Sequence, residues 1–101
     1  MQALINLIDH QMTLQAAVVA PWVWTRGDVV EIEQGFPSRV RDALGSMGHP
    51  VAPVRLVGGG MNAVAINEDG SMGGAACWRA DGTPIGLFGG LERTGSRFSA
   101  E

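Results

Sequence analysis

Hydroxyl side chains are the first candidates for chemistry in this chain, because serine and threonine can act as nucleophiles. The candidates considered are Thr13, Thr25, Ser38 and Ser46. A hydroxyl nucleophile needs a base and an oxyanion hole within reach, and none of the four lies in a Gly-x-Ser-x-Gly turn. Helix capping or solvent exposure is therefore the predicted role of each.

The two histidines and the single cysteine are predicted to be structural. His10 and His49 each follow a helix pattern, where the helix dipole favours an imidazolium. Only the adjacent Asp9 offers a further ligand, so no metal site is predicted. Cys77 ends an apolar strand pattern beside Trp78 and is predicted to be a buried, unreactive thiol. One cysteine also excludes an internal disulfide and a thiolate metal site.

Three consecutive glycines, Gly58-Gly59-Gly60, raise the question of a phosphate-binding loop. A P-loop would continue with Lys and then Ser or Thr, and a dinucleotide loop would open a helix. Here Met61-Asn62 and an alternating strand pattern follow instead. The glycines are therefore predicted to allow a tight turn and close backbone packing.

The tryptophans and the late arginine suggest surface contacts. Trp22 and Trp24 flank Val23, so in a strand both rings would face one side. We interpret them as a packing or interface patch in preference to a ligand platform. Arg79 and Asp81 are predicted to pair locally, and an exposed pair of this kind contributes little stability.

Composition indicates a globular chain and excludes several classes. The 101 residues are 46% hydrophobic and 17% charged, which predicts one domain or a piece of one. The net charge is −3 and the seven basic residues are scattered, which argues against a nucleic-acid partner. No signal-peptide pattern is found, and no apolar run approaches the roughly 20 residues that cross a membrane. The sequence does not indicate a cellular compartment.

Three helices are predicted. The first covers residues 2–10 and has an apolar face too wide for a surface helix of a small domain. The second covers residues 14–20, with Thr13 as its N-cap. The third begins at Pro37 and ends at Gly48, which suits a left-handed C-terminal stop. Its apolar stripe comprises Val40, Leu44 and Met47.

Four strands are predicted between and after the helices. They cover residues 29–33, 54–57, 63–67 and 71–77, and Asn67-Glu68-Asp69-Gly70 is a strong hairpin turn. The first strand alternates and is predicted to be half-buried. Val30 and Ile32 lie on one face of this strand, and Glu31 and Glu33 lie on the other.

Four segments together resemble the C-terminal part of the small subunit of γ-glutamyltranspeptidases, which are N-terminal-nucleophile hydrolases. They are LINLIDHQMTLQAAVVAPWVW, VVEIEQGFPSRVRDALGSMGHPV, GGGMNAVAINEDGSMGGA and AACWRADGTPIGL. The resemblance covers residues 2–87. It lies in the order and spacing of paired helices, a strand with a Phe-Pro helix start, a glycine-led hairpin and a retained arginine, Arg79.

The chain departs from the family pattern at three places. Trp22 stands where the family has arginine after Ala-Pro, and Cys77-Trp78 stands where it has Asp-Pro. Ile85-Gly86-Leu87 replaces Ala-Gly-Tyr. These changes indicate a divergent branch, whose substrates need not be restricted to glutathione.

The resemblance implies a function that the rest of a larger enzyme would complete. In the family, a precursor cleaves itself to expose a threonine, which attacks a γ-glutamyl carbonyl with its own α-amine as base. That threonine, the glutamyl-binding residues and the oxyanion hole would all precede Gln2. No catalytic, cofactor-binding or metal-ligating residue is therefore assigned to this chain, and no cofactor is expected.

The predicted fold is α+β, a partial αββα layer of the N-terminal-nucleophile hydrolase type, with antiparallel strands and helices on one face. Residues 1–88 would form this C-terminal segment and residues 89–101 a flexible tail. The expected partner is the remainder of the parent enzyme or a second copy, with neither nucleic acid nor membrane involved. The alternative is a non-catalytic interaction module that docks through strand edges and Trp22/Trp24.

Overall fold

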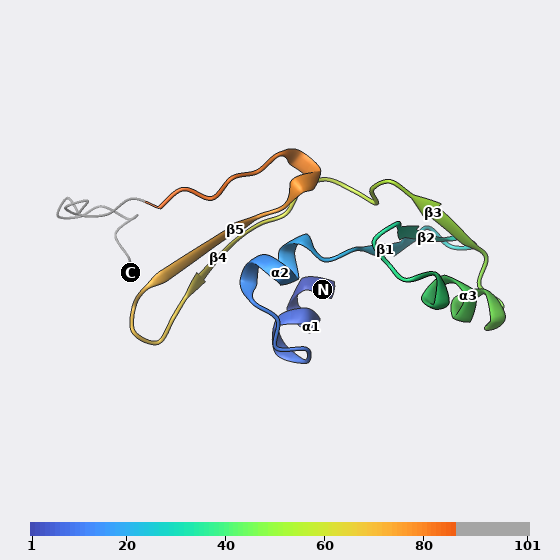
Figure 1. The fold of residues 1–101 in the computed structure, drawn as a ribbon, viewed down its shortest axis with the longest axis horizontal. Helices are drawn as coiled ribbons and strands as arrows, with labels where there is room; N and C mark the ends of the chain where they lie inside the picture. The colour runs from blue at the N-terminus through green and yellow to red at the C-terminus, as the bar shows by residue number, and fades with distance from the viewer. Residues whose placement is uncertain (87–101) are drawn as a thin grey trace.

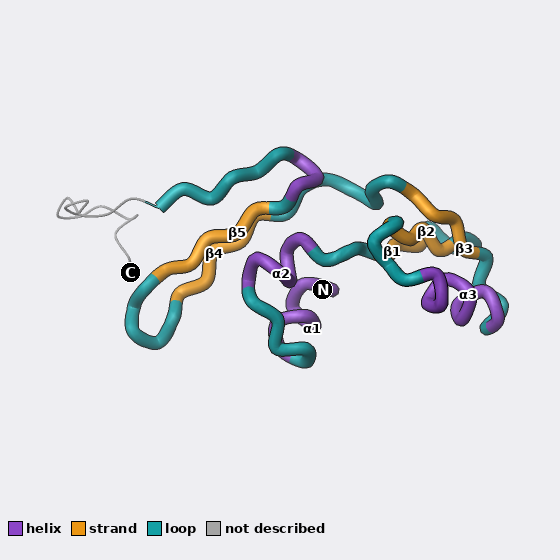
Figure 2. The backbone as a smooth tube through the Cα atoms, viewed as in Figure 1, coloured by secondary structure: helices purple, strands orange, loops and turns teal. Residues whose placement is uncertain are grey.

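The structure, a computed structural model, describes residues 1–86. Figures 1 and 2 show its helices and strands in sequence order. They are α1 (Gln2–Ile8), α2 (Leu14–Val19), β1 (Val23–Thr25), β2 (Val30–Glu33), α3 (Ser38–Ser46), β3 (Val51–Val54), β4 (Asn62–Ile66), β5 (Met72–Ala76) and the 3-10 helix η1 (Trp78–Ala80). The predicted tail, residues 89–101, lies outside the described residues. No helix in the described part is long and apolar enough to cross a membrane.

The strands form two separate sheets. The first has the order β1-β2-β3, and the second is the β4–β5 hairpin. The predicted α+β class is confirmed, but β2 and β3 pair in parallel, with Val30 opposite Val51. Helix α3 lies between these two strands in sequence and returns the chain to the same end of the sheet, which a parallel pair requires. Helix α2 packs on the hairpin, α1 on α2, and α3 on β3.

One strand lies three residues earlier than predicted. The sequence pattern placed it at residues 54–57, after Pro53, whereas β3 covers Val51–Val54 and includes that proline. Pro53 lies opposite Ile32 of β2, and β3 is an edge strand. An edge strand tolerates proline, because only one side of it must supply ladder hydrogen bonds.

The hairpin turn matches its prediction. Ile66 pairs with Met72, and the backbone N–H of Asn67 donates to the carbonyl of Ser71 at 2.8 Å. Gly70 has a φ of +82°, a conformation that residues with a Cβ rarely adopt. The Asp69 carboxylate accepts from the backbone N–H of Ser71 at 2.9 Å, which closes the turn.

The predicted helix ends are largely confirmed. The Thr13 hydroxyl accepts from the backbone N–H of Ala16 at 3.2 Å, so it is the N-cap of α2. Gly48 follows α3 with a φ of +91°, which gives the left-handed stop. Pro37 is the N-cap of α3 instead of its first helical residue, and α1 ends at Ile8, two residues early.

The core of the described part is small, and the chain is extended. Its buried apolar residues are Ala3, Ala17, Val18, Ile32, Ala75, Ala76 and Cys77. The radius of gyration is 17.7 Å, against about 13 Å for a compact domain of 100 residues. Figure 1 shows the hairpin reaching away from the three-stranded sheet, with α1 and α2 between them.

Both α1 and the hairpin leave apolar side chains uncovered. On α1, Leu4 is 54% exposed and Ile8 is 72% exposed, in line with the predicted wide apolar face. On the hairpin, Val64 is 71%, Ile66 68% and Met72 64% exposed. The described residues therefore leave one apolar face of the hairpin and part of α1 open to another layer.

Candidate functional site

The most distinctive site is a buried ion pair between Glu33, the last residue of β2, and Arg79 in η1. Arg79 Nε donates to Glu33 Oε1 at 2.7 Å, and Arg79 Nη2 donates to Glu33 Oε2. The Arg79 side chain is 0% exposed, and the Glu33 side chain is 2% exposed. Two predictions are therefore wrong. Glu33 does not lie on a solvent face, and Arg79 does not pair with Asp81.

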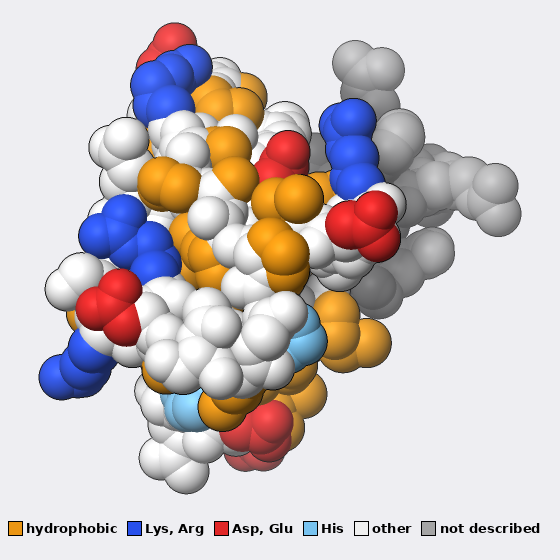
Figure 3. Space-filling view, turned by 90° about the vertical axis from the view of Figure 1, so that its right-hand side faces the viewer, with side chains coloured by type: hydrophobic (Ala, Val, Ile, Leu, Met, Phe, Trp, Pro, Cys, Tyr) orange, Lys and Arg blue, Asp and Glu red, His pale blue; other side chains and the backbone are white. Residues whose placement is uncertain are grey.

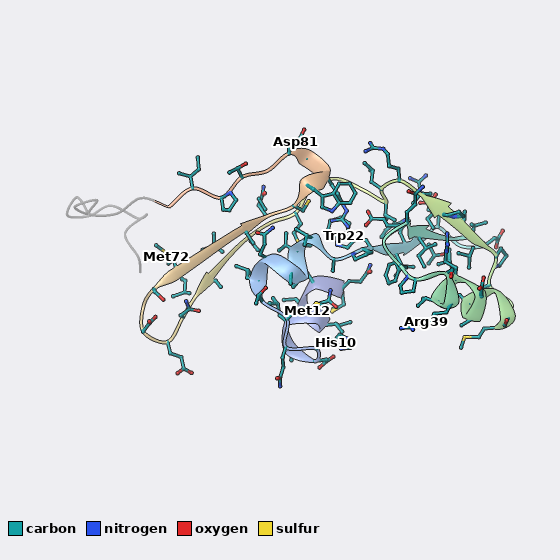
Figure 4. The ribbon with its side chains drawn as sticks, viewed as in Figure 1. His10, Met12, Trp22, Arg39, Met72 and Asp81 are labelled. Carbon is teal, nitrogen blue, oxygen red and sulfur yellow. The ribbon has the colours of Figure 1, made fainter. Side chains whose placement is uncertain are left out.

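The geometry of η1 explains why the predicted local pair fails. Asp81 ends η1 in a left-handed conformation with a φ of +50° and is exposed. In Figure 4 it lies at the outer side of η1, whereas Trp22 lies on the inner side, next to the body of the molecule. The turn thus directs Arg79 inward, where a carboxylate must compensate its charge.

Further hydrogen bonds satisfy the rest of the pair. Glu33 Oε2 accepts from the Trp22 backbone N–H at 2.8 Å, and Oε1 accepts from the Val57 N–H at 3.0 Å. Arg79 Nη2 donates to the Ala20 carbonyl at 2.9 Å, and Nη1 to the Val18 carbonyl at 3.4 Å. No buried side-chain nitrogen or oxygen within residues 1–86 lacks a partner. The pair is thus fully compensated, as a buried charge must be to persist.

The pKa shifts of the pair follow from these contacts. Burial by itself would raise the pKa of the Glu33 carboxyl, but the bonds from Arg79, Trp22 and Val57 together lower it. The bond to Glu33 raises the pKa of the Arg79 guanidinium. Both groups are therefore charged at neutral pH. A carboxylate whose two oxygens accept four hydrogen bonds is poorly placed to act as a general base.

Two indole rings lie within cation–π distance of the guanidinium. Arg79 Cζ lies 3.7 Å from the ring centroid of Trp22 and 4.8 Å from that of Trp78. Trp22 is half-buried here, while Trp24 in β1 is 52% exposed. Trp22 thus packs inside the chain, against Arg79, and a joint interface patch of Trp22 and Trp24 stays a prediction.

Cys77 is buried as predicted, and Gly60 packs closely against a neighbouring residue; that the thiol is unreactive stays a prediction. Cys77 is 1% exposed, and its sulfur accepts from the Met61 backbone N–H at 3.0 Å. Burial would raise the pKa of this thiol, but the Met61 N–H and Arg79 lower it. A Cβ on Gly60 would lie 2.5 Å from the Cβ of Ala80. The glycine therefore allows the close backbone packing that the sequence predicted.

The other candidate residues lie at turns and helix ends. Thr25 exchanges hydrogen bonds with the Gly27 backbone and donates to the Val29 carbonyl, and Thr13 caps α2. Ser38 and Ser46 are the first and last residues of α3, and His10 and His49 follow α1 and α3. Within the part of the chain that the structure describes, no group of three His, Cys, Asp or Glu side chains can hold a metal ion.

The chain is similar to known proteins over nearly its whole length. Residues 1–87 match the gamma-glutamyltranspeptidase family. The chain is 57% identical over 99 residues to the Acylase ACY 1 proenzyme from two strains of Pseudomonas sp.. The match covers 98% of this chain but only 18% of the length of each relative.

Solved structures show the same fold. Cephalosporin acylase from Bacillus halodurans aligns with a TM-score of 0.79 and 29% identity, over 89% of this chain and 18% of that one. γ-Glutamyltranspeptidase from Pseudomonas nitroreducens aligns with a TM-score of 0.73 and 24% identity, over 85% of this chain and 47% of that one. The predicted partial layer of the N-terminal-nucleophile hydrolase type is confirmed. The chain belongs to the γ-glutamyltranspeptidase family and corresponds to part of its members' length.

Proposed function

We propose that this chain is the C-terminal structural segment of a γ-glutamyltranspeptidase-like amidohydrolase or acyl transferase, and that it is inactive alone. The observation that carries this proposal is the open apolar face of the hairpin, formed by Val64, Ile66 and Met72. The opposite hairpin face already packs on α2. A hairpin that is apolar on both faces needs a layer on each side, so the parent enzyme would supply the second layer.

The side chains of residues 1–86 support a scaffolding role. The Glu33 carboxylate is saturated by hydrogen bonds, and the hydroxyls of Thr13 and Thr25 are engaged in local ones. The family resemblance assigns the nucleophilic threonine and the oxyanion hole to residues that would precede this chain. The segment would thus hold the sandwich in shape around an active site built elsewhere.

The names of the relatives favour cleavage of an amide bond. Two of them are called acylases and one a γ-glutamyltranspeptidase. We propose that the parent enzyme forms an acyl-enzyme: a hydroxyl adds to the amide carbonyl, the C–N bond breaks, and the amine leaves with a proton. Water or an acceptor amine then takes the acyl group. The favoured substrates are amides whose acyl group is not γ-glutamyl. Amides of the γ-glutamyl group, such as glutathione, are the second class.

The test compares the purified chain with the full-length protein that contains it. Both are incubated with γ-glutamyl-4-nitroanilide and with a cephalosporin that carries an amide side chain, and amine release is measured. We expect release by the full-length protein and none above buffer by the chain alone. Turnover by the pure chain would refute the scaffolding role. Full-length protein that cleaves neither amide would refute the proposed reaction.

Assembly can be tested on the same material. The partner would be the remainder of the parent enzyme, or a second copy when the chain is alone, because the open hairpin face favours association. Light scattering during size-exclusion chromatography should show dimers or larger species of the isolated chain. Val64→Thr/Ile66→Thr should shift it toward monomer. A wild-type chain that runs as a stable monomer would contradict this.

A further inference from the structure

The structure brings together two positions at which this sequence departs from its family. Trp22 and Trp78, which the family resemblance sets against an arginine and a proline, both lie against the guanidinium of Arg79. We propose that the two indoles form an aromatic clamp that holds Arg79 in place and thereby fixes the hairpin relative to the first sheet. This proposal concerns stability and does not rest on the proposed function.

The guanidinium makes hydrogen bonds and aromatic contacts at the same time. Its N–H groups donate to Glu33 and to the carbonyls of Val18 and Ala20. The indoles of Trp22 and Trp78 lie against the same group, and the Arg79 side chain is 0% exposed. A planar cation suits this arrangement, whereas an ammonium group has neither flat faces nor a fork of donors. Lysine should therefore be a poor substitute for Arg79.

The clamp lies where three parts of the chain meet. Glu33 belongs to the three-stranded sheet, and Arg79 and Trp78 follow the hairpin. The carbonyls that Arg79 binds lie at the end of α2, and Trp78 Nε1 donates to the Val19 carbonyl there at 3.4 Å. Since the two sheets share no strand pairing, the clamp positions the hairpin relative to the first sheet.

An open cleft adjoins the clamp but is not needed for its role. It has a volume of about 340 Å³ and is lined by Val19, Pro21, Glu33, Gln34, Gly35, Arg55 and Trp78. The Glu33 oxygens at its wall already accept four hydrogen bonds. The side chains therefore explain the cluster as an internal contact, and no ligand has to be invoked.

The test is a mutant cycle measured by urea unfolding of the full-length protein. Trp22→Leu and Trp78→Leu are made in the wild type and in a Glu33→Leu/Arg79→Met background, which removes the ion pair. This background also loses the hydrogen bonds to the backbone of Trp22, Val57, Val18 and Ala20 and is itself less stable, so only the difference between the tryptophan costs in the two backgrounds is read. Cation–π contacts contribute about 1 kcal/mol at exposed sites and about 2 kcal/mol when desolvated, equivalent to roughly 5-fold and roughly 30-fold, respectively, in the folding equilibrium constant. Each tryptophan change should therefore cost about fivefold or more in the wild type beyond its cost in the apolar background.

Controls keep the result interpretable. Trp24→Leu alters an exposed indole away from Arg79 and should cost the same in both backgrounds. Where Trp22→Leu does not fold, Trp22→Phe retains an aromatic face and gives a smaller loss of the same sign. Arg79→Lys should lower the folding equilibrium constant at least about tenfold. Equal costs of the tryptophan changes in both backgrounds, or an Arg79→Lys protein as stable as wild type, would overturn the clamp.

Discussion

Replacement of Glu33 by glutamine is the sharpest test of the buried ion pair. Glutamine keeps the size of the side chain but removes the charge. One of its two terminal atoms becomes an N–H donor, so it must face a donor from Trp22, Val57 or Arg79. Arg79 would then remain buried with only neutral acceptors, the glutamine oxygen and the carbonyls of Val18 and Ala20, and with no opposite charge.

The expected cost is large because one charge loses its partner. Removal of one member of a buried pair typically costs about 3–5 kcal/mol, on the order of 10²- to 10³-fold in the folding equilibrium constant. The matched control is Glu31→Gln, two residues away in the same strand, where no ion pair is formed among the described residues. A surface-like change of this kind should stay within about 0.5 kcal/mol.

The assay is urea unfolding of the full-length protein, followed by tryptophan fluorescence from pH 7 down to pH 3. The folded pKa of Glu33 is lowered, so its stabilising effect is complete above the unfolded pKa of about 4.3. As the pH falls through the lower folded pKa, the effect is lost, and the difference between wild type and Glu33→Gln should shrink. A variant as stable as wild type at pH 7, or a difference that does not change with acid, would refute the reasoning.

Three further predictions concern local packing and turns, each read as a free energy of unfolding. Gly60→Ala should cost about 1–3 kcal/mol, because the new Cβ would lie 2.5 Å from the Cβ of Ala80. Gly59→Ala should cost far less, because the space around Gly59 is open. Ala80→Gly should restore the stability that Gly60→Ala removes. Gly70→Ala should cost about 1–2 kcal/mol because of the positive φ, and Gly70→Asn less; equal costs would contradict the turn. Thr13→Ala should cost about 1 kcal/mol by removing the α2 cap, and Thr13→Ser almost nothing.

Local features of this fold were predictable because neighbouring residues determine them. The hairpin follows from the Asn67–Gly70 turn between alternating strands, and the end of α3 from Gly48. The cap of α2 needs only a hydroxyl three residues before a free N–H. The prediction for β3 failed because Pro53 was taken as a strand boundary, whereas its place at a sheet edge makes it acceptable.

The candidate site was predicted less well, since its parts are distant in sequence. The alternation of β2 placed Glu33 outward, beside solvent, and the nearest acid to Arg79 in sequence was Asp81. A retained arginine among altered neighbours was the one available signal. It identified Arg79 as special but did not indicate its partner, which is 46 residues away.

The sequence by itself determined the family, through the order of four segments along the chain. It also determined the hairpin, the α2 cap, the α3 stop and the burial of Cys77, which depend on residue types at short spacing. Only the tertiary structure decided that Glu33 is buried, that Trp22 and Trp78 enclose Arg79, and that β2 pairs with β3 in parallel. The physical reason is that a charge can be buried only where distant segments supply every compensating contact at once. Those contacts exist only after the chain has folded.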